Sequence, residues 1–421
     1  MITKNILPNN IRVVMQPMPD FRSVSMGVWA QAGSVYETQR EAGISHFIEH
    51  MLFKGTQKRT AQDIAAQMDA LGGNLNAFTS KACTCFYAKV LDEHIEKSAD
   101  ILADLVHAPK LDAADIEREK GVVCEEILMT EDTPEDLVHE LIAAQVYGDA
   151  PLGKPILGTE ASVRALDADM LRAYMQRRYV SENMVIAVAG NFKQEDMLAL
   201  LTPLFGEGDA KKAPPMPPSA LHKGRALKAV EKDIEQVHIC LGLPGFPSDT
   251  PEQYALHALN NVLGGSMSSR LFQSIREERG LAYSVYSYPS AYSDSGYFTL
   301  YAGTGEKQAA QVVTLMLGEL KRLQKEGITQ DELIRAKEQL KASYIMGQES
   351  TSARANAIGK AEIRGGKLRT EEESIALIEA VTMEHIQSIL PAVCDFDNLH
   401  GAFVGRMTKK EKEIEAMILN A

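Results

Sequence analysis

The chain has 421 residues, 45% of them hydrophobic, and a formal net charge of −13, so we expect at least two domains with substantial cores. A phosphate backbone needs a basic partner, and this charge balance argues against nucleic acid. No run approaches the roughly 20 apolar residues of a membrane helix, and residues 1–8 lack the pattern of a signal peptide, so we expect a cytoplasmic protein with no membrane partner.

Five cysteines are scattered along the chain, and so small an odd number does not build a disulfide framework in a protein of this length. We expect reduced thiols that pack in the interior rather than a redox or metal site. They are Cys83, Cys85, Cys124, Cys240 and Cys394.

Hydrophobic periodicity predicts a regular series of elements in the first half of the chain. A Gly-Gly pair at 72–73 interrupts this series and precedes its longest predicted strand. Gly55 is expected to cap the helix that contains His46. The predicted strands span 11–16, 23–32 and 74–90, and the predicted helices span 41–55, 61–71, 92–106 and 115–129.

A polar, proline-rich stretch at 207–225 has few residues suited to a core, which is typical of a linker. The sequence therefore predicts an N-terminal domain at 1–208, a linker at 209–225 and a C-terminal domain at 226–421. In the second half the predicted strands span 236–243, 282–290 and 296–302, and the predicted helices span 251–263, 269–278 and 308–326.

The two halves show a similar order of elements, which indicates an internal repeat. Residues 46–52 align with 257–263, where Asn260 and Asn261 stand in place of Glu49 and His50. The sequence thus predicts an α+β fold of two homologous domains, each a mainly antiparallel sheet flanked by helices, with the chemistry kept in the first.

Two histidines and a glutamate share one side of the helix predicted around them. At 100° per residue, His46, Glu49 and His50 gather opposite an apolar face. Imidazoles at i and i+4 can reach one zinc ion, while Glu49 lies beside them and is not needed as a ligand. The HxxEH pattern inverts the HExxH metalloprotease signature with the same division of roles, so Glu49 is the candidate catalytic base. The apolar face comprises Ile44, Phe47, Ile48, Met51 and Leu52.

A catalytic zinc needs a third protein ligand, and the helix predicted at 115–129 offers carboxylates. Glu119 and Glu126 lie on its apolar side, whereas Glu117 and Glu125 point the other way. A carboxylate on an apolar stripe requires a compensating cation or hydrogen bonds. One of the first pair would bind the metal and the other would orient a histidine, and periodicity does not rank them.

The segment from His46 to Thr56 resembles the core signature of the M16 metallopeptidases, the pitrilysin and insulinase family, and most closely the bacterial M16B branch that is similar to the mitochondrial processing peptidase β-subunit. The spacing Glu119-x6-Glu126, the run from Gly72 to Thr79, and Arg276-x6-Tyr283 extend the likeness over nearly the whole chain. The resemblance implies a LuxS/processing-peptidase-like metallohydrolase fold.

Site roles follow from the same resemblance. It implies Glu126 as the third ligand of one zinc per chain and Glu119 as its supporting carboxylate. It also implies that Arg276 and Tyr283 meet the substrate backbone and the oxyanion. The matching strand in the family adds the substrate as a further strand, through Asn76, Ala77, Phe78 and Thr79 here.

The expected protein is therefore a zinc metalloendopeptidase acting on short, extended or unfolded peptides. A chain that is half the length of the long family members should form a chambered dimer, either with itself or with a related M16 subunit. Two alternatives are a non-proteolytic scaffold on the same fold and a peptide-binding subunit that depends on another chain.

Overall fold

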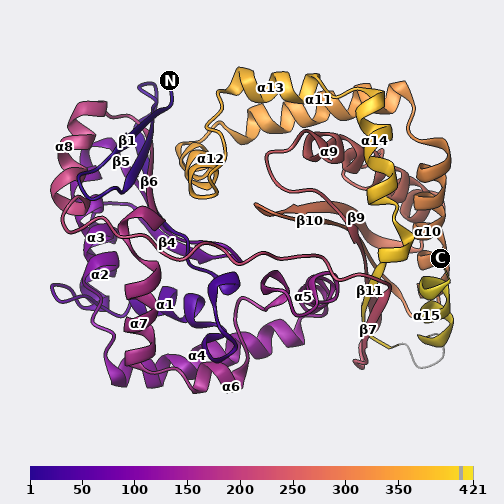
Figure 1. The fold of residues 1–421 in the computed structure, drawn as a ribbon, viewed down its shortest axis with the longest axis horizontal. Helices are drawn as coiled ribbons and strands as arrows, with labels where there is room; N and C mark the ends of the chain where they lie inside the picture. Colours follow the sequence, from indigo (N-terminus) through magenta and orange to yellow (C-terminus); the bar gives the residue numbers. More distant parts are fainter. Residues whose placement is uncertain (407–410, 421) are drawn as a thin grey trace. The chain divides into compact units, whose positions relative to one another are not determined.

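The computed structural model describes residues 1–406 and 411–420, which form two compact units. Unit 1 comprises Met1–Ile127, Lys154–Pro217 and Met346–Thr370. Unit 2 comprises Leu128–Gly153, Pro218–Ile345 and Glu371–Ala421. Each contains one mainly antiparallel sheet flanked by helices, so the predicted α+β class is confirmed (Figure 1).

Unit 1 is built on a six-stranded sheet in the order β1-β2-β6-β3-β5-β4. Only the pair β2 and β6 is parallel. Its strands are β1 (Thr3–Ile6), β2 (Arg12–Pro17), β3 (Ser23–Ala30), β4 (Asn74–Thr79), β5 (Thr84–Leu91) and β6 (Met184–Gly190). The helices of the first half are α1 (Ile44–Leu52), α2 (Ala61–Ala70), α3 (Ile95–His107), α4 (Ala113–Asp132), α5 (Pro134–Tyr147), α6 (Glu160–Arg164), α7 (Ala168–Arg178) and α8 (Gln194–Phe205).

Unit 2 has a five-stranded sheet in the order β7-β11-β8-β10-β9, in which only β7 and β11 are parallel. This is the arrangement of β2-β6-β3-β5-β4, so the repeat predicted from the sequence is present in the topology. The strands are β7 (Ala226–Val230), β8 (Gln236–Pro244), β9 (Ala282–Ala291), β10 (Gly296–Gly305) and β11 (His400–Val404). The helices of the second half of the chain are α9 (Pro251–Leu263), α10 (Ala309–Glu326), α11 (Gln330–Gly347), α12 (Thr351–Ile363), α13 (Glu371–Glu379), α14 (Met383–Val393) and α15 (Glu411–Leu419).

The two repeats exchange a helix, so the compact units are not contiguous in sequence. Helix α12 comes from the second half, yet it packs on β3 and β6 of unit 1 (Figure 1, orange). Helix α5 comes from the first half and packs on β8 and β11 of unit 2. In unit 1 the exchanged helix closes a small second core in which Ile358 and Ile363 meet Trp29, Cys85 and Ala187. One face of each sheet is thus covered by the other half of the chain.

Three predicted elements differ from the structure. The helix expected at 41–55 is α1 alone, and its C-cap is Phe53 rather than Gly55, which forms an isolated bridge with Thr60. The strand expected at 74–90 is a hairpin whose turn is closed by Ser80 Oγ, which accepts from the Cys83 amide at 3.1 Å. The helix expected at 269–278 contains a π-helix at Phe272–Glu277.

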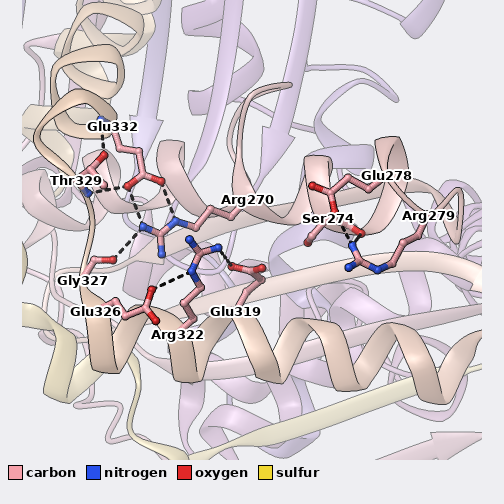
Figure 2. Close-up of polar contacts among 10 residues, drawn as sticks. All are labelled: Arg270, Ser274, Glu278, Arg279, Glu319, Arg322, Glu326, Gly327, Thr329 and Glu332. Carbon is pink, nitrogen blue, oxygen red and sulfur yellow. Dashed lines mark hydrogen bonds and ion pairs between the residues drawn. The ribbon is translucent and has the colours of Figure 1, made fainter.

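A half-buried ion pair ties Arg270, two residues before the π-helix, to the start of α11 in unit 2. Arg270 donates to both carboxylate oxygens of Glu332 at 2.8 Å and to the Gly327 carbonyl at 2.9 Å. The Thr329 amide donates to the same carboxylate at 2.7 Å, which fixes the turn between α10 and α11 (Figure 2).

All five cysteines are buried and free, as expected from the sequence. Among the helices of the described residues, none is long and apolar enough to cross a membrane.

Candidate metal centre

Helix α1 presents its polar residues away from the core of unit 1. The apolar face predicted from the sequence is confirmed, since all five of its side chains are at most 1% exposed. His46 is buried, while Glu49 and His50 are half-buried. The amphipathic pattern alone therefore fixes which side of the helix faces the sheet.

Three side chains converge between two helices: His46 and His50 of α1, and Glu126 of α4. His46 Nε2 lies 3.6 Å from Glu126 Oε2, and His50 Nε2 lies 3.4 Å from the same oxygen. The possible ligand atoms of the three residues all lie within 4.8 Å of one another, and they are the only such group among the described residues. Two ligands on one tetrahedral zinc stand about 3.3 Å apart, so this donor set fits a zinc ion.

The protonation of these groups is shaped by burial and by one another. Burial, followed by the charge of His50, lowers the pKa of His46 to about 4, so this imidazole is neutral at pH 7. Burial also acts to lower the pKa of His50, but Glu126 and Glu119 raise it overall. The hydrogen bond from His50 lowers the pKa of Glu126. A metal ion here would take the place of the proton that the carboxylates favour on His50.

Glu119 links the second histidine to a lysine. Its Oε1 lies 2.8 Å from His50 Nδ1, and its Oε2 lies 2.6 Å from Lys54 Nζ. The carboxylate is 4% exposed, so Lys54 supplies the charge that compensates its burial. The sequence-based prediction did not include Lys54. Its position four residues after His50, on the same helical face, could have indicated that it contacts the same carboxylate.

Glu49 is held from the edge of the sheet. Thr79 on β4 donates its hydroxyl hydrogen to Glu49 Oε2. Burial raises the pKa of Glu49, while the bond from Thr79 lowers it. A raised pKa suits a group that must accept a proton near neutral pH. The sequence predicts mainly a backbone role for Thr79, in binding substrate, and nothing in the pattern indicates this side-chain contact.

Strand β4 carries the four residues predicted to bind substrate. It pairs only with β5 in the described sheet, so its other edge has no strand partner there. Ala77 packs against the main core and Phe78 against the core beneath α12, while Asn76 is exposed. The contact between Thr79 and Glu49 places the end of this strand beside the candidate metal ligands.

Arg276 and Tyr283 lie in unit 2 and contact each other. The guanidinium lies 4.4 Å from the Tyr283 ring centroid and 4.8 Å from that of Phe272, and its Nη1 donates to the Tyr283 carbonyl at 2.7 Å. The tyrosine ring is 76% exposed. Their action on substrate stays a prediction.

The fold and the histidine–carboxylate cluster agree with a metallopeptidase, and family models and relatives show that the chain belongs to the insulinase family, peptidase family M16. The family model described as Insulinase (Peptidase family M16) matches residues 12–160. A second model, Peptidase M16 inactive domain, matches residues 165–340. The closer likeness to one branch of the family stays a prediction.

Relatives that match nearly the whole chain are named zinc proteases. The uncharacterized zinc protease YmxG of Bacillus subtilis is 44% identical over 390 residues, which cover 92% of this chain and 95% of that protein. An uncharacterized zinc protease of Streptomyces coelicolor is 40% identical over 92% of this chain and 86% of its own length.

Solved structures match the fold. The peptidase M16 inactive domain from Pseudomonas fluorescens superposes with a TM-score of 0.88 at 21% identity, over 96% of this chain and 98% of that one. A protease from Helicobacter pylori superposes with a TM-score of 0.87 at 22% identity, over 96% of this chain and 99% of that one.

Proposed function

We propose that the chain is a zinc-dependent endopeptidase that cleaves short, extended or unfolded peptides. The observation that carries the proposal is the convergence of His46, His50 and Glu126 beside Glu49. Relatives that cover nearly all of the chain are named zinc proteases, which supports the same assignment.

Each residue has a defined part in this reaction. His46, His50 and Glu126 would hold one zinc ion, which supplies Lewis acidity toward the scissile carbonyl and acidifies water. Glu49 would take a proton from the attacking water and return it to the leaving amine. Thr79 fixes one oxygen of Glu49, so the other is the proton acceptor. Glu119 accepts the Nδ1 proton of His50, which leaves Nε2 for the metal.

Substrate would add to the edge of β4 as a further strand. Asn76, Ala77, Phe78 and Thr79 would bind it chiefly through backbone hydrogen bonds, because the strand has no partner on that side in the described sheet. Backbone recognition tolerates many sequences, so we expect broad specificity. Mass-spectrometric mapping of cleavage sites in a peptide library measures it directly.

We further propose that the active form is a dimer, as a homodimer or with a related M16 subunit, in which Arg276 and Tyr283 act on peptide held at the partner's zinc. Mixing Arg276→Ala chains with Glu49→Gln chains tests this arrangement. Recovery of activity in the mixed dimer supports action between chains, and no recovery contradicts it.

The proposal as a whole is tested by Glu49→Gln. The variant should keep zinc, because Glu49 is not a ligand, and should lose cleavage of a quenched fluorescent peptide, because the proton acceptor is gone. Zinc content is measured alongside by metal analysis, and chelator treatment of the wild type should also stop cleavage. Wild-type rates in the Glu49→Gln protein would contradict the mechanism.

A non-proteolytic role on the same fold, as a scaffold or as a peptide-binding subunit, is the competing function. Asn260 and Asn261 stand where the first repeat has Glu49 and His50, and this half matches the model named inactive domain. The first repeat keeps its ligands, which favours the enzyme. A purified chain that binds zinc and peptide without cleaving it would favour the alternative.

A further inference from the structure

The start of the metal-binding helix is capped by a buried carboxylate from outside the helix. Glu37 is 3% exposed and follows the short 3-10 helix η1 (Ser34–Tyr36). Its Oε2 accepts from the Gly43 amide at 2.7 Å, and its Oε1 accepts from the Ser45 amide at 2.9 Å. These amides belong to the N-cap and the second residue of α1.

The helix has no cap of its own at this end. Gly43 has no side chain and adopts the left-handed conformation with φ of +88°. The first amides of a helix have no partner within it, and a negative charge at this end is favoured by the helix dipole. Glu37 meets both needs at once.

Glu37 is itself fixed by a neighbouring loop. Lys154 Nζ donates to the Glu37 carbonyl, and Lys81 Nζ donates to the Lys154 carbonyl at 2.5 Å. The loop packs so closely that a Cβ added at Gly43 would lie 2.5 Å from the Leu157 carbonyl oxygen. The main chain at Glu37 is therefore held by contacts outside the helix that its carboxylate caps.

The two candidate histidine ligands are supported in different ways. His50 is oriented by Glu119 at its Nδ1. The Nδ1 of His46 is buried and has no hydrogen-bond partner among the described residues. His46 is the third residue of α1 and so lies in its first turn, where helices fray most easily. Its orientation depends on the main chain of that turn.

We propose that Glu37 is a positioning residue of the metal centre, which acts through the first turn of α1 to hold His46 opposite Glu126 and thereby sets zinc affinity. This inference rests on the proposed function. Glu37 does for the first histidine through the backbone what Glu119 does for the second through its side chain.

The electrostatics agree with this geometry. Burial raises the pKa of Glu37 to about 7, whereas the bonds from the Ser45 and Gly43 amides lower it. These two amides are the largest influences that favour the ionised carboxylate at this buried position, and the Ser45 side chain and the charge of Lys154 add to them. Measurements at pH 8, above this pKa, favour the ionised form of Glu37.

The test compares zinc dissociation constants by chelator competition at pH 8, together with the visible absorption spectrum of the cobalt-substituted protein. Glu37→Gln places an amide NH2 against one backbone N–H group, so one of the two hydrogen bonds to the start of α1 is lost. We expect zinc binding to weaken by roughly tenfold or more, which is the effect of removing a group that orients a metal ligand. Glu37→Asp keeps the charge and should recover part of this loss. The cobalt spectrum should change in Glu37→Gln, because the ligand geometry changes.

Glu362 provides a matched control in the same unit. It is also 3% exposed and pairs with Lys4 and Arg12, away from the metal centre. Glu362→Gln should lower thermal stability but leave zinc affinity within twofold of the wild type. A purely structural role for Glu37 predicts the same result for both variants.

Equal zinc affinity in folded Glu37→Gln and wild type would overturn the inference while leaving the proposed function intact. If that variant does not fold, Lys154→Met loosens the anchor of Glu37 instead, and unchanged zinc affinity in it would be equally decisive. A wild-type chain that takes up no zinc would refute the proposed function and this inference together.

Discussion

At the scale of single residues, the proposed metal centre combines candidate ligands with buried groups that contact them. Glu119 is the clearest case, because one buried carboxylate contacts both His50 and Lys54. Its burial was indicated by helical phase, but its partners became visible only when two helices were brought together.

Glu119→Gln should weaken zinc binding by about 10- to 100-fold, because His50 loses a charged acceptor and Lys54 loses its counter-ion. Chelator competition on the purified protein measures the change. Glu125→Gln is the control, since Glu125 is exposed on the same helix and should leave the affinity unchanged. Equal effects of the two substitutions would contradict the assigned role.

Acid stability of unit 2 should depend on Glu332. Burial raises the pKa of this carboxyl, but hydrogen bonds from Arg270 and the Thr329 backbone outweigh burial and hold the pKa at about 2 (Figure 2). Because the folded pKa is lowered, the contribution to stability is present above about pH 4.5 and is lost as pH falls toward 2. Glu332→Gln should therefore be less stable than wild type near neutral pH and should lose less stability between pH 4.5 and 2.

Chemical denaturation at several pH values measures this slope. Glu338→Gln on the same helix is the control, because Glu338 pairs with Lys341 at the surface and is 67% exposed. A surface pair contributes little, so its removal should leave the slope unchanged.

At the scale of elements, close backbone approach decides where α12 can lie. A Cβ added at Gly359 would lie 2.3 Å from Nε1 of the buried Trp29 ring, which β3 holds in place. Overpacking of this kind typically costs 1–3 kcal/mol, so Gly359→Ala should lower the free energy of unfolding by about 2 kcal/mol.

Gly121 is the matched helical glycine in the same unit. Nothing lies within 4 Å of a Cβ added there, so Gly121→Ala should raise stability by about 0.5–1 kcal/mol. Denaturant titration of both variants measures the contrast. If Gly359→Ala were also stabilising, the close packing of α12 on the sheet would be disproved.

At the scale of the whole molecule, the exchanged helices make each half of the chain dependent on the other. The fragment 1–208 has the complete sheet of unit 1 but lacks α12, which covers one of its faces. We expect Cys85 to become reactive toward a thiol reagent in this fragment, whereas it is fully buried in the intact chain. Cys124, in the main core, should stay protected.

Mapping of the labelled cysteines by mass spectrometry distinguishes the two thiols. Adding the 226–421 fragment during refolding should restore protection of Cys85, since it supplies α12. Full protection of Cys85 in the isolated 1–208 fragment would mean that the half folds without its exchanged helix.

The sequence by itself determined the α+β class, the internal repeat and the polar face of α1, because these follow from the periodicity of apolar residues and from the spacing of His46, Glu49 and His50. Helical phase also separated Glu126 and Glu119 from their exposed neighbours. The sequence-based prediction missed two features. One is the hairpin turn at 80–83, where a single stretch of β-forming residues folds back on itself, and the other is the π-helix before Tyr283.

Only the tertiary structure decided the rest. Contacts such as Thr79 with Glu49, Lys54 with Glu119 and Glu37 with the start of α1 join residues on different elements or on the segments between them. The exchange of α5 and α12 is equally invisible in the sequence, because an amphipathic helix shows which face is buried but not which sheet buries it. The local pattern of apolar residues indicates which surfaces are buried, and tertiary packing determines which residues and which sheet those surfaces contact.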